Sequence, residues 1–202
     1  MARPRSQEKE KALIDAATEL FLKQGVCKTT IKDIAEQADV AVGTVYVYCK
    51  DKIEVIRRVA FAFADQHKAL AEEALGSRKK PMGKLQAYIL GLYDLWLPFG
   101  ENSQGSIELA QAVIKFAPET LSMAESEFVR TVETILKEGR ATGLRIESPK
   151  EEARWIALAT SPFFPLAGMP QKHPFSSQLN REDLVGFLKW LERKMKPGVV
   201  KK

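Results

Sequence analysis

Residues 30–52, TIKDIAEQADVAVGTVYVYCKDK, carry the most informative pattern in the chain. They read as two short helices joined by a tight turn at residues 39–41. Thr30 is followed three residues later by Asp33, which is the spacing of a capping box that starts a helix. The second helix, at residues 42–49, carries a threonine and two tyrosines where a fully buried helix would be apolar. This pattern predicts a helix-turn-helix, whose second helix lies in the major groove of DNA.

The second helix divides into an inward and an outward side. Val45 and Cys49 are four residues apart, so they share a face and can pack on the preceding helix. Gly43 would let the backbone approach DNA closely, and the hydroxyls of Tyr46 and Tyr48 would point outward and donate to phosphates. The candidate DNA-binding residues are Thr30, Gly43, Thr44, Tyr46, Val47, Tyr48, Lys50 and Lys52.

Each of these residues also has an ordinary structural interpretation. Tyrosines on a short helix often lie at the edge of a core, and lysines that follow a helix are usually solvated. The combination of a capped first helix, a turn at the right distance and a polar second helix favours DNA binding.

The rest of the chain is expected to be helical. Apolar residues recur at helical spacing, and no stretch alternates with period two over any length, so no sheet is expected. The expected helices cover residues 7–24, 52–75, 82–97, 104–116, 118–141, 148–160 and 181–195, and the Pro-rich residues 161–174 are expected to form a loop or kinked turns. The predicted fold is all-α, with about nine helices. A three-helix helix-turn-helix domain occupies residues 1–52, and a helical effector-binding and dimerisation domain occupies residues 53–202.

Composition limits the possible functions. The chain has 202 residues, a net charge of +5 and two cysteines, and its charged start lacks an apolar leader, which predicts a reduced, cytoplasmic protein. No apolar run approaches the roughly 20 residues that span a bilayer, so no membrane is expected. With only two histidines, no metal-ligand spacing and no Gly-rich phosphate loop, we expect neither an enzyme nor a metal or cofactor site.

The charge of the helix-turn-helix is balanced. Residues 1–55 hold nine Lys and Arg and nine Asp and Glu, so DNA binding must depend on which face these charges occupy.

The segment TTIKDIAEQADVAVGTVYVYCKDKIEVI resembles the N-terminal domain of the TetR family of bacterial transcriptional regulators over about residues 10–56. The resemblance implies DNA contacts at Thr30, Gly43, Thr44, Tyr46, Tyr48 and Lys52. It also implies a homodimer that binds a palindromic double-stranded DNA operator, usually as a repressor. A small ligand in the C-terminal domain would release the repressor, and helix 52–75 would transmit the change.

Three positions depart from the family's pattern. Asp39 replaces a usual glycine in the turn, Ala41 replaces a usual serine cap, and Cys49 replaces a usual phenylalanine. These departures predict a less rigid helix-turn-helix, and the position of Cys49 beside Lys50 leaves open a redox role for this cysteine. They also keep one alternative open, namely a small-molecule-binding or adaptor protein of the same fold that does not bind DNA.

The C-terminal region suggests the chemistry of an effector but not its identity. Large apolar side chains are spread over helices that would surround a cavity, although each of them taken singly is more typical of a core residue than of a ligand contact. The candidate effector-binding residues are Trp96, Phe99, Phe116, Met123, Phe128, Trp155 and Phe163. They predict a hydrophobic or aromatic effector.

Dimerisation is expected to use the last two helices. Residues 181–195 carry apolar residues on more than one stripe, as expected for a helix that packs on its own domain and on a partner. The candidate dimer-interface residues are Leu184, Phe187, Leu188, Trp190 and Leu191.

Overall fold

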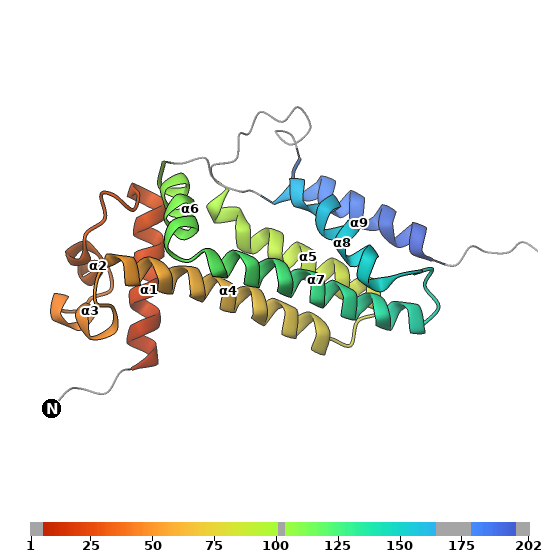
Figure 1. The fold of residues 1–202 in the computed structure, drawn as a ribbon, viewed down its shortest axis with the longest axis horizontal. Coiled ribbons are helices and arrows are strands. Elements are labelled where there is room, and N and C mark those ends of the chain that lie inside the picture. Colours follow the sequence, from red (N-terminus) through yellow and green to blue (C-terminus); the bar gives the residue numbers. More distant parts are fainter. Residues whose placement is uncertain (1–5, 101–103, 165–178, 197–202) are drawn as a thin grey trace, which may run out of the picture. The chain divides into compact units, whose positions relative to one another are not determined.

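The computed structural model describes residues 6–100, 104–164 and 179–196. These residues form nine α-helices and two short 3-10 turns, with no strand among them, which confirms the all-α prediction. Figure 1 labels the helices. Their bounds are α1 Gln7–Gln24, α2 Ile31–Gln37, α3 Val42–Tyr48, α4 Lys52–Gly76, α5 Pro81–Trp96, α6 Gln104–Phe116, α7 Pro118–Ala141, α8 Pro149–Thr160 and α9 Arg181–Met195, with 3-10 turns η1 Leu97–Phe99 and η2 Ser161–Phe163. The loop expected at residues 161–174 begins with η2, and its residues from 165 onward lie outside the described ones.

Local sequence signals set most of these bounds. Pro81, Pro118 and Pro149 each stand first in a helix, where the missing N–H is not needed and φ is already suitable. Gly25 and Gly143 follow α1 and α7 with φ of 92° and 96°, a left-handed conformation that glycine adopts without a steric penalty. The expected helix ends therefore agree with the observed ones to within one or two residues.

The chain packs as two compact units. Of the described residues, unit 1 comprises 6–65, 98–100 and 104–122, and unit 2 comprises 66–97, 123–164 and 179–196. The units divide the chain within α4, η1 and α7. The assignment of residues 1–52 to DNA binding and of 53–202 to effector binding is a statement about function that this packing does not test, and it stays a prediction.

Unit 1 contains the helix-turn-helix, in which α1, α2 and α3 lie next to one another (Figure 1). Helix α6 packs on α1, which explains why residues so distant in sequence join this unit. At Gly105 the two helices approach so closely that a Cβ would lie 2.2 Å from the carbonyl oxygen of Leu22. The core of the unit includes Phe21, Ile34 and Val45, each 0% exposed.

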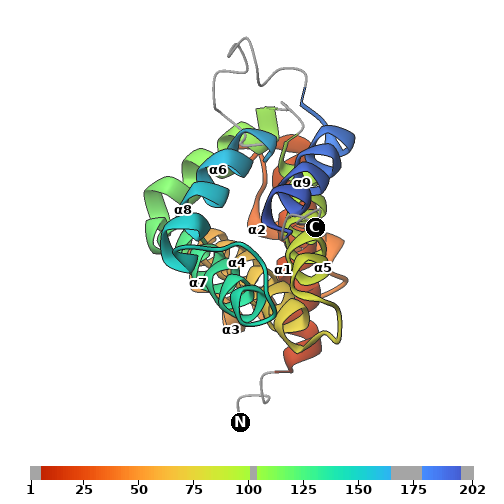
Figure 2. The same cartoon turned by 90° about the vertical axis from the view of Figure 1, so that its right-hand side faces the viewer.

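Unit 2 has its own core, to which α5, α7, α8 and α9 contribute. Figure 2 shows α9 beside α5, and two polar contacts join this pair. Arg181 donates to both carboxylate oxygens of Asp94, at 2.8 and 3.0 Å, and Gln86 donates to Glu192 at 3.0 Å. No helix among the described residues is both long enough and apolar enough to cross a membrane.

Candidate nucleic-acid interface

The first helix of the motif starts at the predicted capping box. The backbone N–H of Asp33 donates to the Thr30 hydroxyl at 3.2 Å, and the backbone N–H of Thr30 donates to the Asp33 carboxylate at 2.8 Å. That second hydrogen bond is the main reason why the pKa of Asp33 lies below its ordinary value. The Thr30 side chain therefore caps α2, and its own proton remains available as a donor because the cap uses the oxygen only as an acceptor.

The turn between the two helices contains a residue in a strained backbone conformation, as expected from an aspartate in place of the usual glycine. Asp39 adopts φ of 51°, the left-handed conformation that a glycine would occupy more easily. Ala41 occupies the N-cap of α3 and makes no side-chain hydrogen bond. A serine or threonine cap stabilises a helix by about 1 kcal/mol, so α3 depends on its buried face to hold its place.

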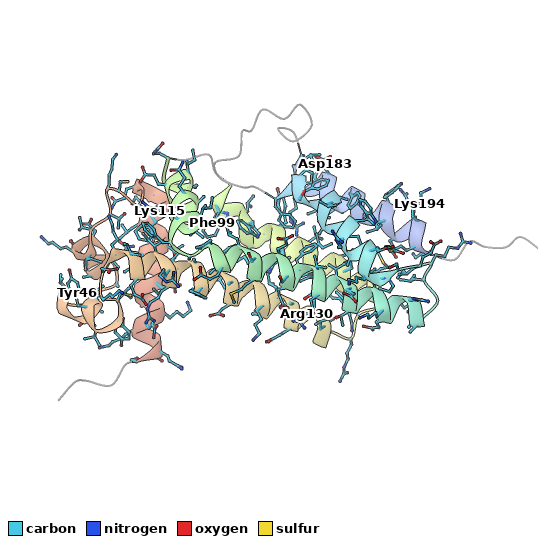
Figure 3. All side chains as sticks on the ribbon, in the orientation of Figure 1. Tyr46, Phe99, Lys115, Arg130, Asp183 and Lys194 are labelled. Carbon is cyan, nitrogen blue, oxygen red and sulfur yellow. The ribbon has the colours of Figure 1, made fainter. Side chains whose placement is uncertain are left out.

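The anchor of α3 is as expected. Val45 and Cys49 are 0% exposed and pack in the core of unit 1. Full burial makes Cys49 a core side chain, with no access for an oxidant in this conformation. By contrast, Tyr46 is 54% exposed and Val47 is 46% exposed. Gly43 is exposed, and a Cβ added there would meet no atom within 4 Å. Figure 3 shows Tyr46 on α3, away from the core of unit 1.

The outward orientation expected for Tyr48 is wrong. Its side chain is only 5% exposed, and its hydroxyl accepts from the backbone N–H of Ser6 at 2.9 Å and donates to the Ser6 carbonyl at 3.2 Å. Tyr48 lies three residues after Val45, so helical periodicity places both on the buried face. That spacing was visible in the sequence. Tyr48 therefore fixes the chain just before α1, and of the two phenols only Tyr46 is exposed.

Lys52 also differs from its expected role. Its ammonium donates to the carbonyl of Val26 at 2.9 Å and to that of Thr29 at 3.1 Å, so it holds the segment between α1 and α2 in place.

Of the other candidates, Lys50 is exposed and Thr44 is half-buried. The structure therefore brings together an exposed surface, which we call the α3 face and which consists of Gly43, Thr44, Tyr46, Val47 and Lys50.

The residues expected to surround an effector differ in burial. Phe99 and Phe116 belong to unit 1, whereas the other candidates belong to unit 2. Within unit 2, Phe128 is buried, Trp96 and Phe163 are half-buried, Met123 is 49% exposed and Trp155 is 67% exposed. Apolar character alone does not show on which side of a helix a residue lies, so the assignment of these seven residues to an effector site stays a prediction.

The expected dimer residues also separate into two sets. Leu184 and Leu188 are 0% and 1% exposed in the core of unit 2, so they stabilise the protomer itself. Trp190 is 46% exposed and stacks on the half-buried Phe187, with ring centroids 5.9 Å apart. The half-buried Leu191 packs against the same core.

Helix α8 contributes an exposed apolar surface of its own. Trp155 is 67% exposed and Leu158 is 62% exposed, three residues apart and so on one side of the helix. They line a small pocket together with Glu151 and Arg154.

Two buried polar residues of unit 2 were not among the candidates. His67 on α4 is 4% exposed and Tyr88 on α5 is 1% exposed. Burial lowers the pKa of His67 to about 4, which the carboxylate of Glu127 opposes, and it raises the pKa of Tyr88 above its ordinary value. Helical spacing could have revealed His67, since it lies four residues after Phe63 and continues the apolar stripe of α4.

Comparisons with known proteins find the helix-turn-helix segment in bacterial regulatory proteins. Residues 13–59 match the model of the family described as bacterial regulatory proteins, tetR family. The chain is 30% identical over 90 residues to the HTH-type transcriptional regulator TtgR of Pseudomonas putida, and the match covers 44% of this chain and 43% of TtgR. It is 42% identical over 50 residues to the HTH-type transcriptional regulator HbdR of Aromatoleum sp., covering 25% of this chain and 22% of HbdR. The matched segments thus span less than half the length of these relatives.

Solved structures show that the likeness in fold extends over nearly the whole chain. A γ-butyrolactone receptor described as ArpA-like matches with a TM-score of 0.60 at 18% identity, over 95% of this chain and 88% of the receptor. PfmR, a TetR family transcriptional regulator from Thermus thermophilus, matches with a TM-score of 0.59 at 18% identity, over 92% of this chain and 99% of PfmR. Residues 13–59 thus match the helix-turn-helix region of the tetR family of bacterial regulatory proteins, and the remainder of the chain shares the all-α fold of these solved structures.

Proposed function

We propose that this protein is a sequence-specific DNA-binding transcriptional regulator, and that the α3 face reads the DNA. One observation carries the proposal. A short helix is anchored from behind by Val45 and Cys49, yet it exposes a glycine, a phenol and a valine to solvent. An exposed Val47 side chain contributes little to the stability of a monomeric domain, whereas it can pack on the methyl group of a thymine. The Tyr46 hydroxyl can donate to a phosphate.

Exposed lysines in the helix-turn-helix support this function. Lys32 at the start of α2 and Lys50 directly after α3 are exposed, and neither forms an ion pair among the described residues. Several acidic residues of unit 1 are engaged elsewhere. Glu10 pairs with Arg58, and Glu119 accepts from Arg57 at 2.7 Å. The cations are therefore available to phosphates, although the charges of residues 1–55 balance by count.

Replacing Gly43 with alanine separates DNA binding from folding. No atom lies within 4 Å of the added Cβ, so the free energy of unfolding should rise by about 0.5–1 kcal/mol, because alanine favours a helix. The same Cβ would hold the helix away from the groove, and DNA affinity should fall about tenfold or more, which corresponds to about 1.4 kcal/mol. Fluorescence anisotropy with fragments of the neighbouring promoter DNA, combined with urea denaturation, measures both effects.

Gly76 at the end of α4 provides the control. A Cβ there also meets no atom within 4 Å, so Gly76→Ala should not destabilise the protein and should leave DNA affinity unchanged. If Gly43→Ala and Gly76→Ala bound DNA equally well, the α3 face would not be the DNA-reading surface. If the unmodified protein bound no DNA at all, the alternative of a ligand-binding or adaptor protein of this fold would replace the regulator.

We further propose that the protein is a repressor and that a small apolar or aromatic effector bound in unit 2 releases it from a palindromic operator. Several aromatic rings of this unit lie near one another. Phe128 lies 5.8 Å from Tyr88 and 6.5 Å from Phe164, measured between ring centroids. The fold is shared with a protein described as a γ-butyrolactone receptor, which is consistent with a ligand-binding role.

We also propose that the protein acts as a homodimer and that α8 and α9 form the interface. The exposed Trp155 and Leu158 of α8 and the exposed Trp190 of α9 are large apolar side chains that the protomer leaves largely uncovered. Such side chains are typical of the centre of an interface. A two-fold axis through these helices would pair identical surfaces and thus two reading helices.

Placing charge on α8 should separate the protomers. We expect the double substitution Trp155→Glu and Leu158→Glu to raise the dimer dissociation constant on the order of 100-fold, because carboxylates would be desolvated in the interface. Sedimentation equilibrium measures the change. The control is Leu121→Glu, at a leucine of unit 1 that is 42% exposed, which should not alter the association state. An unchanged dimer in the α8 variant would contradict this interface.

A further inference from the structure

The core of unit 2 contains two polar atoms that no other group satisfies. Neither Nδ1 of His67 nor the hydroxyl of Tyr88 has a hydrogen-bond partner among the described residues. Their rings meet edge to face with centroids 6.5 Å apart, so the two groups, which come from α4 and α5, lie close together. A buried polar group without a partner typically costs about 1–3 kcal/mol, which makes such a pair unusual in a core shaped by stability alone.

The nearest polar neighbours do not complete these bonds. Glu127 on α7 accepts from Arg130 at 2.5 Å and from the hydroxyl of Thr131 at 3.2 Å, so its carboxylate is already engaged. Thr131 is itself 0% exposed, and its hydroxyl lowers the pKa of Tyr88 as a hydrogen-bonding neighbour does, but the two side chains do not form a hydrogen bond of normal geometry. The proton of the phenol and one nitrogen of the imidazole therefore remain available to a molecule that enters the core.

The surroundings of this pair disfavour charge. Burial keeps the imidazole neutral by lowering its pKa, and it keeps the phenol neutral by raising its pKa. The ring of Phe128 lies beside Tyr88, and the half-buried Phe164 lies edge-on to Phe128. A molecule that fits here needs an apolar body for the rings and an uncharged polar atom for His67 and Tyr88.

We propose that His67 and Tyr88 form the polar anchor of the effector site, and that they bind one uncharged oxygen, a hydroxyl or a carbonyl, on an otherwise apolar molecule. The proposal rests on the ligand control proposed above and specifies the chemistry of that ligand. A hydroxyl oxygen can accept from the phenol and donate to a neutral imidazole nitrogen. A carbonyl oxygen can accept from the phenol and from an imidazole N–H. A carboxylate would have to leave water for an apolar site, where Arg130, the cation whose charge acts on Tyr88, is already paired with Glu127.

Four probes of similar size test this chemistry by titration calorimetry on the protein without DNA. They are 4-propylphenol, butyrophenone, propylbenzene and 4-propylbenzoate. We expect the phenol, the ketone or both to bind about tenfold more tightly than propylbenzene, and the benzoate to bind no more tightly than propylbenzene. The choice between phenol and ketone identifies which oxygen the site accepts. If neither exceeds propylbenzene, the proposed anchor does not exist.

Tyr88→Phe removes only the hydroxyl and is the decisive variant. We expect it to abolish the advantage of the oxygen-bearing probe and to raise the melting temperature of the free protein, because an unsatisfied polar group is lost. His67→Leu should likewise abolish the advantage. Tyr93→Phe, at another buried tyrosine of α5, is the control and should leave probe binding unchanged.

Unchanged probe binding by Tyr88→Phe would overturn the anchor, and the melting temperature then gives the reason. If the melting temperature does not fall, the ligand binds elsewhere. If it falls, the phenol is satisfied by a bridging water only. Both readouts are independent of DNA, so a failure of the anchor is distinguished from a failure of the proposed regulator, which the promoter-binding assay decides.

Discussion

Gly105→Ala should lower the free energy of unfolding by about 2–3 kcal/mol, the range that overpacking produces. A Cβ at this position would lie 2.2 Å from the carbonyl oxygen of Leu22 and 2.6 Å from that of Phe21. Both atoms belong to the backbone of α1, so no side-chain rotation can relieve the clash, and α1 and α6 must move apart. The effect should outweigh the gain of about 1 kcal/mol that alanine brings to a helix. Urea denaturation followed by circular dichroism measures it.

The control for this prediction is Gly186→Ala, which adds the same methyl group to a helix with open space around it. Its free energy of unfolding should rise by about 0.5–1 kcal/mol. Equal stability of the two variants would show that α6 can withdraw from α1 at little energetic cost, and the close packing inferred for unit 1 would be wrong.

Protonation of His67 should destabilise the protein by up to about 3 kcal/mol as the pH falls from 7 to 4. The pKa of His67 is lowered from 6.5 to about 4 in the folded protein, and a pKa difference of one between the two states corresponds to about 1.4 kcal/mol. Between these two pKa values the unfolded chain binds a proton that the folded protein does not. The contribution is therefore complete above about pH 6.5 and is lost as the pH falls towards 4.

His67→Leu isolates this contribution. Folding lowers the pKa of some carboxylates, such as Asp94 beside Arg181, and their protonation in acid also lowers the free energy of unfolding. This loss is the same in the unmodified protein and in His67→Leu. Glu127, whose charge acts on His67 and Tyr88, and Arg130, whose charge acts on Tyr88, are likewise unchanged. Urea denaturation at several pH values should give a steeper decline for the unmodified protein than for the variant. Parallel curves would mean that His67 is solvated or already protonated in the folded state.

Local structure was predictable because its causes lie within a few residues. The capping box of Thr30 and Asp33, the left-handed backbone at Asp39 and the uncapped start of α3 at Ala41 were all expected and are all observed. Each depends on hydrogen bonds or steric limits between near neighbours in the chain. The same holds for the bounds of the long helices, where prolines and glycines act at the ends.

The direction of individual side chains at the site was less predictable. Tyr46 and Tyr48 are two residues apart with the same phenol, yet one is 54% exposed and the other is buried against Ser6. The burial of Tyr48 depends on the position of α1, which is determined by the packing of unit 1. Lys52 similarly contacts carbonyl groups more than twenty residues away in the chain, at Val26 and Thr29.

The sequence by itself determined the helix-turn-helix and the capping box of its first helix, because a helical period and a capping pattern need no information from distant residues. Only the tertiary structure decided which residues are available for function. It placed Leu184 and Leu188 in the core of the protomer, left Trp155 exposed, and enclosed His67 with Tyr88. The physical reason is that burial is a property of how helices pack against one another, and a stripe of apolar or polar residues does not specify which neighbour will cover it.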